Sequence, residues 1–435
     1  MIIFTEQQTP RLAYTLNHIF NSFLGVQYKL TTDARKFANS SSHKINYSSR
    51  YFNSALQIVP EGLLFENHIR TTKPELHNSI DELPNIFWQE KGDIPFDLFS
   101  ALFWFLSRYE EYQEFKPDLY GRFAATESFA HKNSLLTRPI VDQWLNYFKT
   151  IIKNRFAGIE LKQNTFSAKT TIDVDSPWCY KNKGFLRNMA GFVRDMIFGN
   201  FNNTALRFKV LINKIPDPWH NFKYINELYK NSSTELLFFI HTGNYGKYDK
   251  TVNHKSKAFS GFVKYLDDNA EIGLHPSYKA SNNKNILKNE IDRLSGITGK
   301  KVIKSRQHFL VFSMPAYYNM LIKLGIYQDY SMGFADMSGF RAGTSNPFVF
   351  FDLTANNETG LVIHPFAVMD RTLKTYQGQS AEKAFDTIKT IIENVKKVDG
   401  TFVSLWHNES IGNMFEWKDW LGVFNKTAEY LDKIK

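Results

Sequence analysis

The chain of 435 residues is 43% hydrophobic and 22% charged, carries a formal net charge of +10 at pH 7, and contains no repeat or low-complexity tract. These properties exclude a mostly disordered chain and fit a globular protein with one large domain and a smaller one. The one cysteine, Cys179, excludes an internal disulfide framework and fits a reducing compartment.

The first 160 residues predict a separate α/β domain whose role the sequence does not indicate. Apolar residues at helical spacing predict helices over 10–23, 95–112 and 138–152, and short strand-like runs such as 55–59 lie between them. The run over 95–112 has about a dozen apolar positions, fewer than the roughly 20 that a membrane span needs. We therefore expect it to form a buried helix.

The N-terminal residues do not resemble a signal peptide, because they include the acidic Glu6 and lack a basic start followed by a long apolar run. We therefore expect a cytoplasmic protein. The net positive charge favours anionic partners in general. No nucleic-acid-binding motif accompanies the charge, so we expect no nucleic-acid partner.

Much of the positive charge lies in residues 181–214, where seven Lys or Arg stand against the single acid Asp195. Apolar residues between Phe185 and Met196 recur at helical spacing, with basic residues among them. The segment predicts a basic amphipathic helix. It either covers the fold as a surface helix or makes a peripheral contact with an anionic membrane surface.

Residues 161–435 predict a second and larger domain, because strand-like runs alternate there with helical ones. The strand-like runs are 169–174, 234–241, 270–275, 301–306, 325–331, 361–368 and 401–407. The helical runs are 217–230, 255–268, 283–299, 314–325, 380–398 and 415–434. This alternation predicts a mostly parallel sheet, open or closed into a barrel, with its chemistry at the carboxyl ends of the strands.

Polar side chains stand where four of these strands end. They are Asp173 and Asp175, His275, Arg306 with His308, and His407. Asp173 and Asp175 share one face of a strand, so a cation, a basic residue or a shared proton must offset their repulsion. The alternative for the pair is a strand that simply ends in turn chemistry before Pro177.

Aspartate and histidine together suit Zn, Mn, Fe, Co or Ni, with water as a nucleophile of lowered pKa. A second aspartate can then serve as the base, an arginine can keep that carboxylate ionised and oriented, and a histidine can protonate the leaving group. These roles are supplied in sequence order by Asp173, Asp175, His275, Arg306 and His407.

The strand-end motifs resemble those of the polysaccharide deacetylases. TIDVD resembles the first motif of the family, with Asp173 at the catalytic base and Asp175 at a metal ligand. EIGLH resembles the second motif, with His275 as a metal ligand, and SRQHF resembles the third, with Arg306 orienting the base. FVSLWHN resembles the fifth, with His407 as the general acid.

The resemblance covers about residues 169–435 and implies a distorted seven-stranded (β/α) barrel. It also implies a divalent metal, with Zn expected ahead of Co, Mn or Ni. On the same grounds Leu405 would line the pocket for the acetyl methyl group, with Trp406 beside it. The glycine-rich loop over 329–344 would shape the mouth and bring Arg341 to the substrate.

The chain departs from the family pattern at the second metal histidine, because the residue four positions after His275 is Lys279. His308 is the candidate substitute ligand, and the weaker candidates are His364, His241 and His254. There are three alternatives. Water could occupy the position of the third ligand, Lys279 could supply a positive charge in place of the metal, or the catalytic activity could be lost. The aspartate that supports the acid histidine in the family has Asp370 as its candidate here.

The first hypothesis is a metal-dependent hydrolase that removes an N- or O-linked acetyl group from a sugar or glycan precursor, lipid-linked or nucleotide-linked. The second is a glycosyltransferase that uses Asp-x-Asp to hold a cation on a nucleotide sugar, which leaves His275, Arg306 and His407 unexplained. The third is a deacetylase-like protein that binds glycans without turnover.

Overall fold

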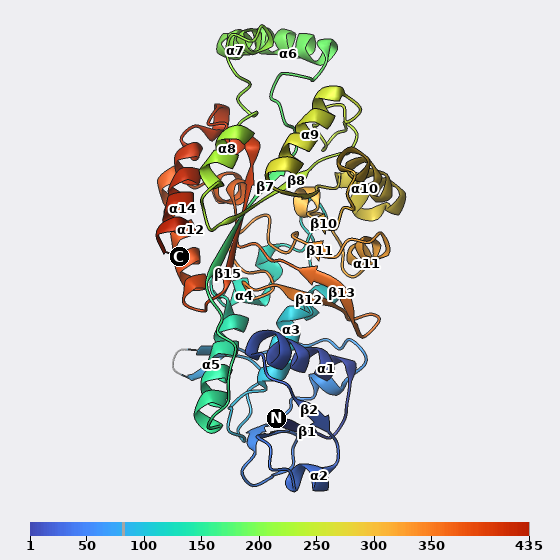
Figure 1. The fold of residues 1–435 in the computed structure, drawn as a ribbon, viewed down its shortest axis with the longest axis vertical. Coiled ribbons are helices and arrows are strands. Elements are labelled where there is room, and N and C mark those ends of the chain that lie inside the picture. The colour runs from blue at the N-terminus through green and yellow to red at the C-terminus, as the bar shows by residue number, and fades with distance from the viewer. Residues whose placement is uncertain (81–82, 435) are drawn as a thin grey trace.

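The computed structural model describes residues 1–80 and 83–434, and Figure 1 shows its two larger sheets along one long axis. The sheet near the N-terminus has four parallel strands in the order β2-β1-β3-β4. Its strands are β1 (Ile2–Thr5), β2 (Lys29–Thr31), β3 (Lys44–Tyr47) and β4 (Leu56–Ile58). A short antiparallel pair follows, formed by β5 (His77–Ile80) and β6 (Leu83–Asn85).

Three helices form where the apolar spacing predicts them: α1 (Pro10–Leu16), continued by a π-helix (Asn17–Leu24), α3 (Leu98–Leu106) and α5 (Ile140–Arg155). Two short helices, α2 (Ala34–Ala38) and α4 (Phe129–Lys132), were not predicted. Every residue of α3 is buried, which confirms the expected buried helix. Among the described residues, no helix combines the length and apolarity that a membrane span needs.

The larger sheet confirms the predicted run of parallel strands. Its nine strands follow the order β12-β13-β11-β10-β9-β8-β7-β15-β14, and each neighbouring pair is parallel except β12 with β13. They are β7 (Ser167–Val174), β8 (Glu235–Ile240), β9 (Glu271–Leu274), β10 (Lys304–Ser305), β11 (Gln328–Asp329), β12 (Phe348–Asp352), β13 (Asn357–Ile363), β14 (Val368–Met369) and β15 (Thr401–His407).

The described strands do not form a closed ring of ladders, so the predicted barrel is not confirmed as such. The chain itself spans the gap, because β13 pairs with β11 and the following β14 pairs with β15. Between them, the amide of Phe366 donates to the carbonyl of Met332, and the amide of Ala367 donates to the carbonyl of Val403. One segment thus runs from one side of the sheet to the other, where a closing strand would lie.

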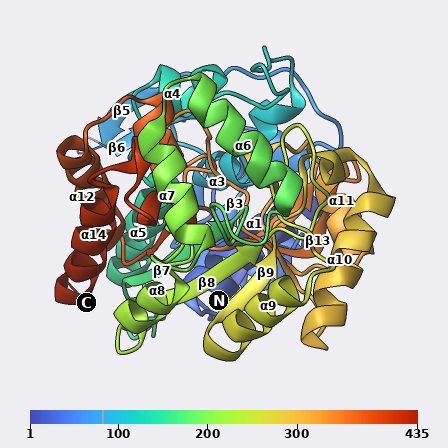
Figure 2. The same cartoon turned by 90° about the horizontal axis from the view of Figure 1, so that it is seen from above.

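Helices cover the outside of this sheet, as Figure 2 shows from above. They are α8 (Phe222–Tyr229), α9 (Lys257–Asn269), α10 (Lys284–Thr298), α11 (Ala316–Lys323), α12 (Ala381–Lys396), the short α13 (Asn408–Ile411) and α14 (Trp420–Ile434). Strand β7 illustrates the alternation: the Thr170 hydroxyl lies 3.0 Å from that of Tyr229 on α8, whereas Thr171 and Asp173 face Arg306 inside.

Residues 181–214 form two helices, α6 (Phe185–Ile197) and α7 (Phe201–Leu211), where the sequence predicted one. Figure 1 shows them as a hairpin that projects from the end of the molecule instead of lying on the sheet. Gly199 in the turn has φ +69°, the left-handed backbone that glycine adopts readily. The predicted surface helix that covers the fold is therefore wrong, and we call this segment the α6–α7 hairpin.

The predicted boundary at residue 160 falls in the connection between α5 and β7, and the independence of the two parts stays a prediction. Side chains tie the parts together. The Tyr14 hydroxyl donates to the carbonyl of Val349 on β12 at 2.8 Å. Asp142 on α5 accepts from the Thr344 hydroxyl at 2.6 Å and from the Ser345 amide at 2.7 Å.

Candidate active site

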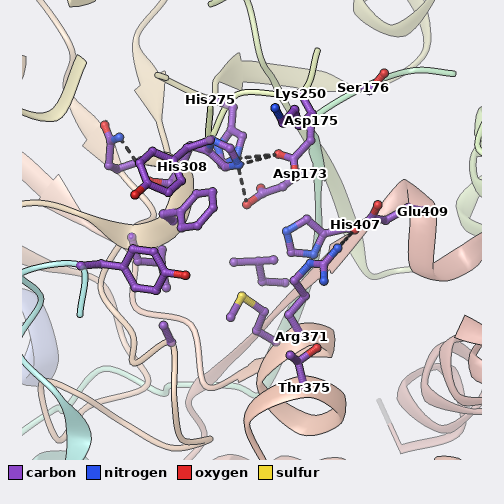
Figure 3. A pocket seen from close by; sticks show the side chains of 18 of the residues that line it. Asp173, Asp175, Ser176, Lys250, His275, His308, Arg371, Thr375, His407 and Glu409 are labelled. Atoms are coloured by element: carbon purple, nitrogen blue, oxygen red, sulfur yellow. Dashed lines mark hydrogen bonds and ion pairs between the residues drawn. The ribbon is translucent and has the colours of Figure 1, made fainter. Parts of the chain in front are cut away.

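The strand-end residues meet in a cavity of about 500 Å³ at the carboxyl ends of β7, β9, β10 and β15. Figure 3 shows Asp173, Asp175, His275, His308 and His407 pointing into it from these different elements. Adjacent parallel strands end at one edge, which explains why positions far apart in sequence converge. Asp173 and His407 are direct neighbours in the register of β7 and β15.

Arg306 holds Asp173 in place. Its Nη1 donates to Asp173 Oδ1 at 3.0 Å and to the Thr171 hydroxyl at 2.6 Å, and its Nε donates to the carbonyl of Tyr330 at 2.9 Å. Arg306 and Asp173 are both buried, and the guanidinium also lies over the ring of Phe239, 4.6 Å from its centroid. The buried arginine therefore offsets the charge of Asp173 and fixes which oxygen faces the cavity.

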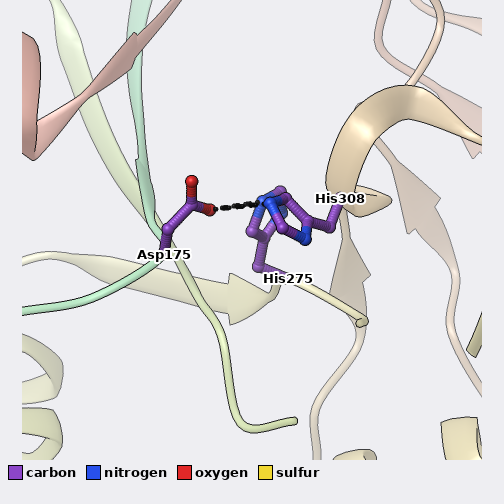
Figure 4. A group of neighbouring side chains, drawn as sticks. All are labelled: Asp175, His275 and His308. Carbon is purple, nitrogen blue, oxygen red and sulfur yellow. Dashed lines mark ion pairs between the residues drawn. The ribbon is translucent and has the colours of Figure 1, made fainter. Parts of the chain in front are cut away.

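Three side chains form a compact group of candidate metal ligands, drawn in Figure 4. One oxygen or nitrogen atom from each of Asp175, His275 and His308 lies within 4.8 Å of the others. Asp175 Oδ1 is 3.2 Å from His275 Nε2 and 3.4 Å from His308 Nε2. Two histidine nitrogens and one carboxylate oxygen are ligands that Zn, Co, Mn and Ni accept.

Hydrogen bonds at the far side of each ring set the direction of the two histidines. His275 Nδ1 lies 2.6 Å from the carbonyl of Arg306, which can only accept, so Nδ1 donates there and Nε2 is the ring nitrogen that faces Asp175. His308 Nδ1 lies 3.0 Å from Asp249 Oδ1. A carboxylate or carbonyl behind the ring is the usual support of a metal-binding histidine.

The backbone after His308 also aims its ring. Phe309 and Leu310 have φ values of 60° and 54°, a left-handed conformation that costs free energy for residues with a side chain. This turn places His308 beside Asp175 directly after β10 ends.

The buried charge of this group suits a cation. Asp175 Oδ1 and His275 Nε2 are buried and lack a hydrogen bond of ordinary geometry within the described part of the chain. Burial by itself lowers the pKa of His308. The carboxylate of Asp175 has the larger, opposite effect, so the pKa of His308 is raised to about 10. In the absence of a metal, a protonated His308 offsets the carboxylate; a divalent cation would replace that proton. The residues present therefore fit a divalent metal.

His407 stands on the other side of Asp173 and is held by Asp370. Its Nδ1 and its backbone amide each lie 2.7 Å from an oxygen of Asp370, and the hydroxyl of Ser410 also donates to that carboxylate. Burial lowers the pKa of His407, but the charge of Asp370 raises it to about 9. His407 thus carries a proton at neutral pH and can give it from Nε2 to a leaving group.

The remaining wall of the cavity is apolar and aromatic. Leu405 packs there with Leu310, Ala335 and Met369, all of which line the cavity. Three tyrosines and a phenylalanine stand around this wall: Tyr120, Tyr248, Tyr376 and Phe309. Apolar side chains suit a methyl group, and aromatic rings suit the faces of sugar rings.

Two predicted substrate residues lie elsewhere. Trp406 is 2% exposed and packs against Phe424 of α14, because neighbouring residues of a strand point to opposite faces and Leu405 takes the inner one. Arg341 is buried in an ion pair in which its Nε lies 2.8 Å from Glu111 Oε1. Both therefore stabilise the fold away from the cavity.

The structure also separates the candidates for the missing ligand. Lys279 is exposed and does not line the cavity, so its charge does not replace a metal. His254 and His364 lie outside the cavity lining as well, and His364 stacks on the ring of Tyr330. His241 is the one weaker candidate near the site, with its Nε2 3.6 Å from Asp249 Oδ1.

Several residues of the site carry no sequence signal. Asp249 lies in a loop after β8 where no periodicity marks it. Arg371 and Glu409 form an ion pair in the cavity wall, and Tyr120 and Arg122 reach the cavity from the first 160 residues. Only proximity in the fold brings these residues to the site.

The chain matches one family model and is distantly similar to several solved structures. A model described as a family of unknown function (DUF7033) matches residues 1–157. No curated protein matches the chain. Among solved structures, the chain is similar to a candidate polysaccharide deacetylase from Mycobacterium smegmatis, with 10% identity over 63% of this chain and 86% of that chain and a TM-score of 0.42.

It is also similar to a polysaccharide deacetylase from Bacillus cereus, with 12% identity over 62% of this chain and 88% of that chain and a TM-score of 0.29. A CE4 family pseudoenzyme from Bacillus anthracis shares 11% identity over 64% of this chain and 66% of that chain, with a TM-score of 0.31. Likenesses this distant assign no activity to the chain, so its function has to be argued from the geometry of the site.

Proposed function

We propose that the chain is a metal-dependent hydrolase that removes an N- or O-linked acetyl group from a sugar or glycan precursor, on a distorted (β/α) barrel. One observation carries the proposal. The candidate ligands Asp175, His275 and His308 lie beside an arginine-held Asp173 and an aspartate-held His407 at the same strand edge. Together these groups can supply a cation, a base and an acid around one cavity.

A divalent cation held by these ligands would supply Lewis-acid polarisation of the acetyl carbonyl and of water. Asp173, oriented by Arg306, accepts the proton of the attacking water as the new C–O bond forms. His407 donates its Nε2 proton to the departing nitrogen or oxygen as the bond from that atom to the acetyl carbon breaks. The products are acetate and the free amine or hydroxyl.

The cavity walls support a sugar as the carrier of the acetyl group. Leu405 and Met369 offer an apolar surface for the methyl group, and the tyrosines at positions 120, 248 and 376 offer rings for a sugar face. A sugar or a glycan precursor that carries a lipid or nucleotide on its reducing end is the substrate class of this proposal.

The test is acetate release from N-acetylated and O-acetylated amino sugars after loading the purified protein with Zn, Co, Mn or Ni. We expect release in at least one metal form, and loss of release in Asp173→Asn. The matched control is Asp268→Asn, an exposed aspartate on α9, which should leave release unchanged. Hydrolysis of a nucleotide sugar without acetate would favour the glycosyltransferase, and glycan binding without any turnover would favour the inactive binder.

A further inference from the structure

The α6–α7 hairpin is apolar on its outer surface. Ten of the twenty exposed large apolar side chains among the described residues lie between 185 and 212. They are Phe185, Leu186, Met189, Val193, Met196, Ile197, Phe198, Phe201, Phe208 and Ile212. Leu186, Ile197 and Phe201 are 82%, 74% and 67% exposed. Patches of this kind on a protein surface mark a contact with a partner or a membrane.

A buried ionic and polar cluster joins the two helices of the hairpin. Asp195 is buried there and accepts from Arg207 Nη2 at 2.9 Å, while Arg207 Nη1 donates to Asn188 at 3.3 Å. Gly191 leaves room for this guanidinium, since a Cβ at that position would lie 2.5 Å from it. The two helices therefore pair here through ionic and polar groups, and most apolar side chains of α6 face outward. At the base of the hairpin, Val210 of α7 is buried against Cys179 and Tyr180.

The base of the hairpin is fixed to the cavity. The carboxylate of Asp217 accepts from the amides of Cys179, Tyr180, Lys181 and Trp219 at 2.7–3.1 Å, which joins the two connecting segments. Trp219 itself lines the cavity.

A second contact holds α6 against a cavity loop. Arg187 donates to the carbonyl of Thr251 at 2.8 Å and lies over the ring of Tyr245, 4.2 Å from its centroid. Tyr248 and Lys250 of the same loop line the cavity. The hairpin thus has a set position at one end of the molecule (Figure 1), and its contacts join it to segments that line the cavity.

The charge of the segment favours an anionic membrane over a protein partner as the surface that the hairpin contacts. Residues 181–214 hold seven Lys or Arg and one acid, Asp195, which is buried and paired. Arg194, Lys209 and Lys214 are exposed. Exposed apolar and basic side chains on one element are complementary to the acyl boundary and headgroups of an anionic bilayer.

We propose that the α6–α7 hairpin docks the protein on an anionic lipid surface and holds the cavity next to it. Its apolar side chains enter the headgroup region, and its exposed lysine and arginine side chains meet the lipid phosphates or carboxylates. Docking does not depend on the hydrolase proposed above. If that hydrolase is correct, the placement favours a substrate anchored in the same membrane.

The test is sedimentation of the full chain with phosphatidylcholine vesicles that contain or lack phosphatidylglycerol. We expect the wild type to bind the anionic vesicles and to be released by salt. The triple variant Ile197→Ser, Phe198→Ser and Phe201→Ser should lower the partition coefficient by more than about tenfold. A control with Tyr51→Ser and Tyr327→Ser, which are exposed elsewhere, should bind as the wild type does.

Two further double variants, one in the hairpin and one outside it, test the contribution of charge to vesicle binding. Lys209→Gln with Lys214→Gln should weaken binding to anionic vesicles, whereas Lys264→Gln with Lys284→Gln, exposed on the outer helices, should not. Acetate release from a water-soluble sugar should be the same in all these variants, so failure of the hydrolase and failure of docking give separate readings. Equal binding by the triple variant and its control would overturn the proposal.

The competing occupant is a second copy of the chain. If the wild type is a dimer in solution, the triple variant is a monomer, and neither binds vesicles, the outer face is a protein interface and the lipid proposal is wrong. Binding to both vesicle types alike would also contradict it, because the basic side chains would then play no part.

Discussion

At the scale of single residues, the site depends on side chains that act in pairs. Asp173 pairs with Arg306, His308 pairs with Asp249, and His407 pairs with Asp370. The sequence predicted the residues at the strand ends because apolar runs mark where strands stop. It could not predict Asp249, which follows no pattern, and it placed Trp406 in the pocket although Leu405 already occupied the inner face of β15.

The first prediction concerns the pH dependence of acetate release. His407 is protonated below about pH 9 because Asp370 raises its pKa against the effect of burial, so acid catalysis is available below that pH and is lost as pH rises through it. Asp370→Asn removes the raising charge. The alkaline limb of the kcat profile should move to lower pH, toward the ordinary histidine pKa of about 6.5.

The control for this profile is Asp268→Asn, which should keep the wild-type limb. An alkaline limb that stays in place in Asp370→Asn, or that persists in His407→Gln, would show that another group titrates.

The second prediction concerns the support of His308. Asp249→Asn keeps the shape of the side chain but removes the carboxylate behind the ring, so the affinity for Zn should fall by about 10–100-fold. Competition with a chromophoric chelator measures the affinity. An affinity equal to that of the wild type would mean that Asp249 serves only the loop, through its hydrogen bond from the amide of Tyr278.

At the scale of elements, the sequence predicted the alternation of β7 to β15 with their helices because each strand and helix buries a continuous apolar face. It missed β12, which lies at the edge of the sheet, and it joined the end of β13 and the start of β14 into one run over 361–368. It predicted the helix between Phe185 and Met196, which is α6, but not the following α7. Periodicity records which side chains share a face, but the turn at Gly199 depends on the polar contacts between α6 and α7.

The third prediction tests that helix pairing. In Gly191→Val the new side chain would displace the guanidinium of Arg207 from Asp195, so hydrogen exchange in α6 and α7 should become faster. The matched control is Gly261→Val on α9, where nothing lies within 4 Å of a new Cβ. If both variants leave exchange in the hairpin unchanged, the Arg207 contact does not hold the helices together.

At the scale of the whole molecule, the first 160 residues do more than stand beside the larger sheet. Tyr120 and Arg122 line the cavity, and the buried pair of Glu111 with Arg341 joins the two predicted domains. The two parts are distant in sequence, so composition and motifs could suggest a boundary between them but not a shared cavity. A role for the N-terminal part in choosing the substrate would follow from this placement.

The fourth prediction concerns this connection. Arg341→Leu leaves Glu111 buried with only Arg108 as a partner, so the free energy of unfolding should fall by about 3 kcal/mol. Urea denaturation measures the change. Lys288→Leu, which removes one exposed ion pair with Asp292, should change stability little. Equal effects in the two variants would mean that the buried pair does not couple the parts.

The central claim is that His308 completes a metal site that the usual sequence spacing leaves incomplete. The most direct measurement is the metal content and Zn affinity of the wild type, His308→Ala and His254→Ala, the last being a half-buried histidine outside the cavity. We predict one equivalent of metal in the wild type and in His254→Ala, and weak or no binding in His308→Ala. Tight binding that survives His308→Ala, or the absence of binding in the wild type, would contradict the account.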